Sequence, residues 1–308
     1  LPPRLWAARP PDERLILSAP LTHSDWMLKP GIAWGEPGVR HMLEACRAAG
    51  WTRIYWRVCD AGQATYASKL MRPGLRTEND NIFNPQNDHD REVVRRLLPA
   101  LTAEQGKGYL KKFETMDYGG FDALASAVKI GHELGLEVHA WVTINEDDHG
   151  WGWASEFAKA NPHCRWVRRD GRAYRSQLSF AFEEVRRYKL GILAELLAYP
   201  IDGLFLDWIR TGDIRDNPQN DPEGIADYGY ETPNIEAFKK LNGIPPQEVA
   251  PNDAGWTRVR AEPLTHFMRA ARELCRTRAP RLPLAAMVGH PWHYRGSIER
   301  IAGNLQGL

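Results

Sequence analysis

The chain has 308 residues and carries 40 Lys and Arg against 39 Asp and Glu, so its formal net charge is +1; 43% of its residues are hydrophobic and 26% charged. This balance argues against nucleic-acid binding through a basic surface and against a disordered chain. No apolar run approaches the roughly 20 residues of a membrane span, and the length suits one α/β barrel of roughly 250 residues or two small domains.

The first third of the chain predicts strands around one helix. From Val39 onward, apolar residues recur at i, i+3, i+4 and i+7, and Gly50 ends the helix. A long polar insert follows at residues 61–118, with one helix candidate near residues 90–98. Loops of this length inside compact domains are usually functional. The expected elements before the insert are a strand at 15–19, a helix at 38–50 and a strand at 53–59.

The remaining two thirds alternate helices with strands. The clearest helix has Leu124 and Val128 in its apolar stripe and ends at Gly135. A further helix is expected from Ser297 onward. The other expected elements are helices at 121–134, 153–160, 182–197 and 256–278, and strands at 136–144, 201–207 and 282–289.

This alternation predicts parallel βαβ units, which a (β/α)8 barrel and a doubly wound sheet both contain. No G-x-G-x-x-G or G-x-x-x-x-G-K-[ST] motif follows a strand, so the doubly wound nucleotide-binding fold lacks its usual signature. The expected fold class is therefore α/β, a (β/α)8 TIM-type barrel forming one domain over residues 1–308. With about five to six βα units visible, the barrel is expected to be incomplete at the C-terminus.

Polar and aromatic side chains follow the expected strands at one end, where an α/β barrel builds its site. In the strand at 136–144, His139, Trp141 and Thr143 alternate onto one side. Twelve Trp is a high count, and such aromatic faces are common where sugars or other flat ligands stack. The residues expected to line the site are His23, Asp25, Arg57, His139, Trp141, Asn145, Glu146, Asp207, Trp208, Arg210, His290 and Trp292.

Asp207 and Glu146 are the expected catalytic residues, and each also has a purely structural interpretation. Asp207 directly follows an apolar strand, so it is expected to be partly desolvated, with Arg57, Arg210 or His139 as its cation. It could instead cap a helix or form a barrel salt bridge. Glu146 could be a solvated loop acid, and His139 a satisfied core histidine.

Other chemistries find weaker support in the sequence. Metal-dependent barrel hydrolases usually carry His-x-His at the first strand, and this chain has only Thr22-His23-Ser24 there. The possible metal ligands are His23, His139, Asp207 and His290, but no two of them have the spacing of ligands on one helix or strand. No G-x-S-x-G nucleophile elbow is present. The four Cys are widely spaced without C-x-x-C, which predicts three buried free thiols and one loop thiol, Cys164. Neither a metal nor another cofactor is expected.

Two carboxylates among aromatic side chains suit glycoside hydrolysis, in which one group protonates the leaving oxygen and another attacks or activates water. The expected function is that of a glycoside hydrolase acting on a poly- or oligosaccharide, with no nucleic-acid partner. A non-catalytic carbohydrate-binding barrel and a metal-dependent hydrolase or deacetylase are the alternatives. Residues 1–14 hold no apolar signal segment, and the sequence predicts neither compartment nor oligomeric state.

An ordered set of motifs is similar to glycoside hydrolase-like family 10, whose members are TIM-barrel proteins related to glycosidases. The set comprises Phe121-Asp-Ala before a helix, Leu136-Glu-Val-His-Ala-Trp-Val, Asn161-Pro-His-Cys-Arg-Trp-Val-Arg-Arg-Asp-Gly-Arg, and Ile201-Asp-Gly-Leu-Phe-Leu-Asp. The resemblance implies that Asp207 is a catalytic carboxylate and that His139 and Trp141 line the substrate cleft. Trp208 stands where the family usually has a second acid, and Arg210 follows it.

Overall fold

The computed structural model describes residues 18–21, 31–60, 62–74, 104, 111, 115–147, 154–207, 209 and 228–287. Five strands form one parallel sheet whose spatial order follows the chain, β1-β2-β5-β8-β9. Each is paired in parallel with its neighbour. The strands are β1 Ser18–Leu21, β2 Arg53–Arg57, β5 Glu137–Thr143, β8 Gly203–Asp207 and β9 Leu284–Ala286.

The strand order distinguishes the two architectures that the sequence left open. A doubly wound sheet reverses its strand order at a switch point, whereas a barrel adds each strand beside the previous one. Within the described residues no reversal occurs, and β1 and β9 form the two edges of the sheet. The α/β class with a parallel sheet is therefore confirmed, and the (β/α)8 TIM-type barrel stays a prediction.

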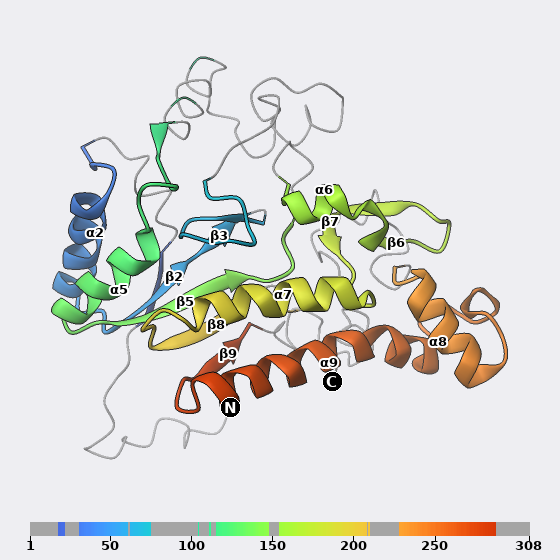
Figure 1. Ribbon diagram of the computed structural model, residues 1–308. Helices are drawn as coiled ribbons and strands as arrows, with labels where there is room; N and C mark the ends of the chain where they lie inside the picture. Colours follow the sequence, from blue (N-terminus) through green and yellow to red (C-terminus); the bar gives the residue numbers. More distant parts are fainter. Residues whose placement is uncertain are drawn as a thin grey trace, which may run out of the picture.

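Helices cover one face of this sheet (Figure 1). Side chains of α2 Glu36–Ala48, α5 Ala123–Glu133, α7 Glu183–Leu196 and α9 Ala254–Arg278 share one hydrophobic core with the strands. The pairs α2–α5 and α7–α9 pack side by side. Asp122 caps α5 by accepting a hydrogen bond from the Ala125 N–H at 2.9 Å, and Asp253 caps α9 through the Trp256 N–H at 2.8 Å.

Alternation along the strands separates the helix-covered face from its opposite. Ile54 and Trp56 of β2, like Val138 and Ala140 of β5, are buried in the core with the helices. The residues between them, such as Tyr55, point to the other face, which belongs to no part of that core. One-sided helix cover is the arrangement of a barrel wall, in which the second face lines the interior.

The predicted elements of the described regions are present with shifted ends. The strand expected at 15–19 is Ser18–Leu21, and the strand expected at 282–289 is the shorter Leu284–Ala286. The short helix expected at 153–160 is α6 Glu156–Ala160. The helix candidate at 90–98, most of the insert and the helix expected from Ser297 lie outside the described residues.

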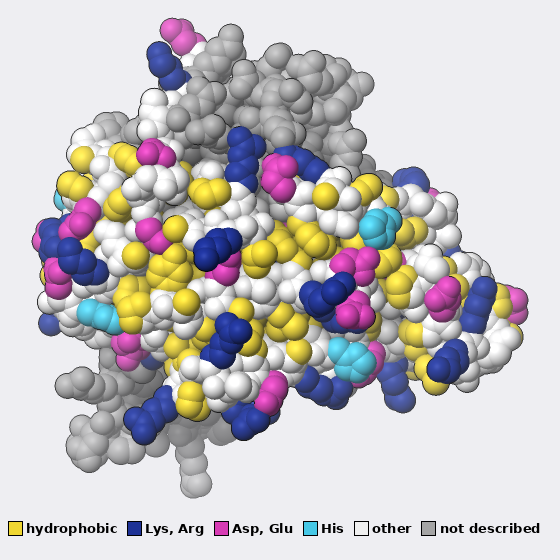
Figure 2. All heavy atoms as spheres, in the orientation of Figure 1, with side chains coloured by type: hydrophobic (Ala, Val, Ile, Leu, Met, Phe, Trp, Pro, Cys, Tyr) yellow, Lys and Arg dark blue, Asp and Glu magenta, His cyan; other side chains and the backbone are white. Residues whose placement is uncertain are grey.

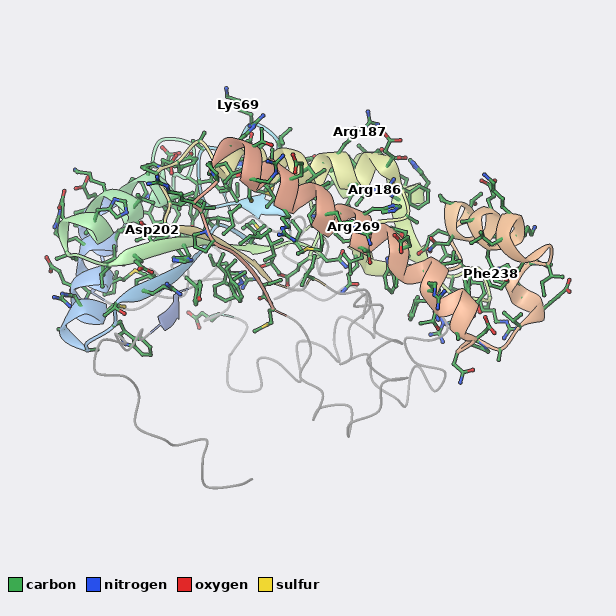
Figure 3. All side chains as sticks on the ribbon, turned by 90° about the horizontal axis from the view of Figure 1, so that it is seen from below. Lys69, Arg186, Arg187, Asp202, Phe238 and Arg269 are labelled. Carbon is green, nitrogen blue, oxygen red and sulfur yellow. The ribbon has the colours of Figure 1, made fainter. Side chains whose placement is uncertain are left out.

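Several elements were not expected from the sequence. They are the hairpin of β3 Cys59–Asp60 and β4 Gln63–Ala64, the 3-10 helices η2 Pro162–Cys164 and η4 Pro246–Glu248, the hairpin of β6 Arg165–Val167 and β7 Ala173–Leu178, and α8 Thr232–Asn242. Helix α8 packs against the part of α9 that lies far from β8. In Figure 3, Phe238 marks α8, and Asp202 marks the point just before β8. Gly243, at φ 75°, ends α8 in the left-handed conformation that favours glycine.

Surface charge and helix hydropathy agree with the composition. On the face shown in Figure 2, basic and acidic side chains of the described residues are interspersed, with hydrophobic side chains between them. In the part of the chain that the structure describes, no helix combines the length and the apolar character needed to cross a bilayer.

Candidate functional site

Three neighbouring strands bring polar side chains together at the carboxyl end of the sheet, on the face without helices. In the register of β2, β5 and β8, Arg57 lies beside Trp141, and Thr143 lies beside Asp207. Adjacent strands are about 4.8 Å apart, so side chains at paired positions are within contact distance. The parallel register therefore positions the predicted residues Arg57, Trp141 and Asp207 in one place.

Asp207 ends β8 and is 4% exposed. Its Oδ2 accepts a hydrogen bond from the indole Nε1–H of Trp141 at 3.0 Å. A buried carboxylate needs such donors, because the loss of water around it is otherwise costly. The sequence suggested Arg57 among the cations for Asp207; the indole is a partner that it did not suggest.

Glu146 lies in the turn after β5 and is 7% exposed, which contradicts its interpretation as a solvated loop acid. Its Oε2 accepts a hydrogen bond from an Nη of Arg57 at 2.7 Å. Arg57 Nε donates to Thr143 Oγ1 at 3.2 Å and to the Cys59 carbonyl at 3.1 Å. The Arg57 guanidinium also lies over the Trp141 ring, with its carbon 5.4 Å from the ring centroid.

Glu146, Arg57, Trp141 and Asp207 thus form one connected group, here called the carboxylate cluster. Arg57 binds Glu146 and stacks on the indole that donates to Asp207. Charge-assisted and buried hydrogen bonds of this kind hold side chains in one orientation. The two carboxylates predicted to be catalytic are therefore linked through two partners that contact each other, Arg57 and Trp141.

A second buried ion pair supports the turn that carries Glu146. Lys189 Nζ of α7 lies 2.5 Å from Asp147 Oδ2, with side-chain exposures of 3% and 1%. The carbonyl of Asp147 accepts from the Ser155 N–H at 2.7 Å. This pair was not predicted from the sequence, although Lys189 interrupts the apolar stripe of α7, and that interruption was the available signal.

Asn145, the residue before Glu146, is fully buried. Its Nδ2 donates to Gln177 Oε1 of β7 at 3.3 Å. This bond ties the turn after β5 to the β6–β7 hairpin. The predicted contact of Asn145 with substrate stays a prediction.

His139 shares a face of β5 with Trp141 but lies away from Asp207. It pairs in register with Gly203, four residues before Asp207, which is about 13 Å along a strand. Its Nε2 is 3.4 Å from Glu137, and its ring meets Tyr55 edge-on with centroids 5.5 Å apart. Burial and the nearby Arg53 lower the pKa of His139, so the imidazole is neutral at pH 7. These surroundings suit a core histidine, and its role in substrate binding stays a prediction.

Aromatic rings line the same sheet face beside the cluster. Phe205 packs against Tyr55 at 4.7 Å and against Trp141 at 6.3 Å between centroids, and all three are half-buried. Trp141 was predicted as a site residue. Tyr55 and Phe205 were not, although alternation along β2 and β8 places them on this face. The remaining predicted residues, His23, Asp25, Trp208, Arg210, His290 and Trp292, lie outside the residues whose side chains are described.

The four cysteines are buried thiols. All four are free and buried, so the expectation of a loop thiol at Cys164 is wrong; Cys164 ends η2 with its side chain in a small apolar core. Burial raises the pKa of the Cys59 and Cys164 thiols to about 12, and a thiol that stays protonated is a poor nucleophile.

One group of side chains within the described ranges has ligand atoms close enough to share a metal ion, namely His163, Cys164 and Glu184. It contains neither His139 nor Asp207. The metal site considered from the sequence, formed by His23, His139, Asp207 and His290, therefore finds no support from His139 and Asp207. His23 and His290 lie outside the described residues.

The chain matches no protein-family model and no curated protein. It is similar to the PgaB (BpsB) glycoside hydrolase domain from Bordetella bronchiseptica, with a TM-score of 0.53, 12% identity, and coverage of 95% of this chain and 69% of that one. It is also similar to α-L-fucosidase isoenzyme 2 from Paenibacillus thiaminolyticus, with a TM-score of 0.52, 15% identity, and coverage of 89% of this chain. The chain spans 32% of the length of the fucosidase.

Identities this low show likeness of fold alone. The resemblance of the motifs to glycoside hydrolase-like family 10 stays a prediction. The comparisons and the sheet agree on the coarser statement: the chain has a glycosidase-like α/β fold built on a parallel sheet.

Proposed function

We propose that the chain is a carbohydrate-active enzyme that hydrolyses glycosidic bonds, with Asp207 as nucleophile or proton donor and Glu146 as the second carboxylate. The observation that carries the proposal is the carboxylate cluster. Two buried carboxylates lie at the carboxyl ends of neighbouring strands, in a chain with a glycosidase-like fold. Glu146 binds Arg57, Asp207 binds Trp141, and the Arg57 guanidinium lies over the Trp141 ring. We further propose a (β/α)8 TIM-type barrel architecture of the glycoside hydrolase-like family 10 type.

The arrangement suits carboxylate chemistry. Burial of both groups keeps bulk water away from the reacting bond, and the fixed donors of Trp141 and Arg57 act on developing charge without reorganising. A separation of about 5–5.5 Å between the carboxyl groups gives retention of anomeric configuration, and about 6.5–9.5 Å gives inversion. The product anomer therefore reports the working distance in the complex with substrate.

The aromatic face beside the cluster is the proposed sugar-binding surface. Tyr55, Trp141 and Phe205 present half-buried rings on the helix-free face, and sugar rings stack on such surfaces through their apolar sides. We extend this surface by the other residues predicted at strand ends, which are His23, Asp25, His139, Asn145, Trp208, Arg210, His290 and Trp292.

The test is a hydrolysis screen on a panel of poly- and oligosaccharides, followed by Asp207→Asn and Glu146→Gln. Each variant should lower turnover by at least about 100-fold, the effect of losing a positioned acid or base. Glu133→Gln, an exposed carboxylate of α5 paired with Arg40, is the matched control and should keep full activity. Glycan binding without hydrolysis by the unmutated protein would instead establish the non-catalytic barrel. Activity that depends on an added metal and survives Asp207→Asn would establish the metal-dependent hydrolase.

A further inference from the structure

A cluster of three metal-ligating side chains lies outside the carboxylate cluster and has no part in the proposed hydrolysis. His163 and Cys164 come from η2, and Glu184 from the first turn of α7. His163 Nε2 is 3.1 Å from Glu184 Oε1, Cys164 Sγ is 3.4 Å from the same nitrogen, and Cys164 Sγ is 3.7 Å from the carboxylate oxygen. An imidazole, a thiol and a carboxylate, three groups that zinc uses as ligands, therefore lie next to one another.

The three distances have the dimensions of a zinc site. They define a triangle whose centre lies about 2.0 Å from each of the three atoms. Zinc binds nitrogen and carboxylate oxygen at about 2.0–2.2 Å and thiolate sulfur at about 2.3 Å. An ion slightly above the centre of the triangle thus meets all three distances without a change of rotamer.

Hydrogen bonds already join these three groups. The Cys164 thiol donates to Glu184 Oε1, and His163 Nε2 faces both the carboxylate and the thiol. An ion at the centre contacts all three at once. The ring of His163 is also held from the side by Phe182, which meets it at 90° with centroids 5.6 Å apart. This contact restricts the orientation of the His163 ring.

The surroundings leave one coordination position open. The Cys164 side chain is buried with Ala158, Leu178 and Val185, whereas the side chains of His163 and Glu184 are 59% and 37% exposed. The group is therefore closed on the protein side and accessible on the other, where a water molecule completes a tetrahedron. Sulfur in the set disfavours Mg²⁺ and Ca²⁺, which take oxygen ligands.

We propose that His163, Cys164 and Glu184 bind one Zn²⁺ ion with three protein ligands and one water. The ion displaces the thiol proton on binding and joins the segment between α6 and β6 to the start of α7. The site is independent of the proposed hydrolysis, so either proposal can fail without the other.

The test is metal binding to the purified full chain after chelator treatment. Zn²⁺ should bind with a stoichiometry of one, measured by competition with a chromophoric chelator, and Co²⁺ in its place should give a thiolate-to-metal charge-transfer band. Binding to the native state should also raise the melting temperature as Zn²⁺ is added. Cys164→Ser should abolish the band, and His163→Ala and Glu184→Gln should each weaken Zn²⁺ binding by more than about 10-fold, the lower bound for groups that merely support ligands.

Matched controls separate this site from adventitious binding. Cys46→Ala removes another buried free thiol, and His266→Ala removes an exposed histidine beside Glu262; neither should change the affinity or the band. Circular dichroism of each variant establishes that it is folded. The proposal is overturned if no Zn²⁺ binds at micromolar concentration, if the Co²⁺ complex lacks the thiolate band, or if binding follows His266 and not His163.

Discussion

The buried pair of Lys189 and Asp147 gives the sharpest prediction for stability. Their charged atoms are 2.5 Å apart, and both side chains are almost fully excluded from water. Lys189→Met keeps most of the aliphatic volume and removes the charge, which leaves the Asp147 carboxylate buried without its cation. Breaking a buried pair in this way costs about 3–5 kcal/mol of unfolding free energy.

A double-mutant cycle isolates the pair from other effects of the substitution. Asp147→Asn removes the stranded charge, so Lys189→Met combined with Asp147→Asn should be more stable than Lys189→Met alone, by at least about 1 kcal/mol. Urea unfolding followed by tryptophan fluorescence and circular dichroism gives the free energies, and an unchanged m-value shows that the same structure unfolds. The reasoning is refuted if Lys189→Met costs less than about 1 kcal/mol, or if the two substitutions add without coupling.

Three further predictions address other parts of the structure. Gly203→Ala places a Cβ 2.2 Å from His139 Nδ1 and should cost about 1–3 kcal/mol of unfolding free energy, measured by urea unfolding; a neutral effect would contradict the packing at this position. Burial raises the pKa of Glu231 to about 7 from 4.5, so the folded state keeps its proton where the unfolded state loses it, and stability falls as pH rises from about 4.5 to 7. Glu231→Gln should remove this loss. The melting temperature of the variant minus that of the unmutated protein should therefore rise between pH 5 and 7 and stay level above pH 7. A difference in melting temperature that does not change with pH would refute the raised pKa of Glu231. Trp141→Phe removes the hydrogen bond to Asp207 and should lower kcat in a glycan hydrolysis assay by about 10-fold or more, and an unchanged kcat would exclude this role for the indole.

The strongly periodic parts of the sequence predicted the fold well. Helices with an apolar stripe, such as α5 and α7, and strands buried on one face by helices were found near their true positions because the pattern reports burial directly. The β6–β7 hairpin was missed because its strands are short and lack clean alternation. The Asp170-Gly171 pair at its turn was the available signal, and Gly171 indeed adopts φ 87°. Helix α8 carries a comparable signal in Pro233 near its start and Gly243 at its end.

The candidate site was predictable in position and not in its partners. Because parallel strands end at the same edge, polar residues after each strand had to meet, and Arg57, Trp141 and Asp207 do so. Which cation binds which carboxylate depends on side-chain directions after a turn, and no local pattern encodes those. Arg57 therefore proved to be the partner of Glu146, a contact between residues 89 positions apart.

Hydrolysis by the unmutated chain and by Asp207→Asn is the most direct test of the proposed function. Reducing-end release from a glycan panel is measured for both proteins, with Glu133→Gln as the folded control. We expect the unmutated protein and Glu133→Gln to release reducing ends, and Asp207→Asn to lose at least about 100-fold of that activity. Unchanged release by Asp207→Asn would contradict the assignment of Asp207 as a catalytic residue.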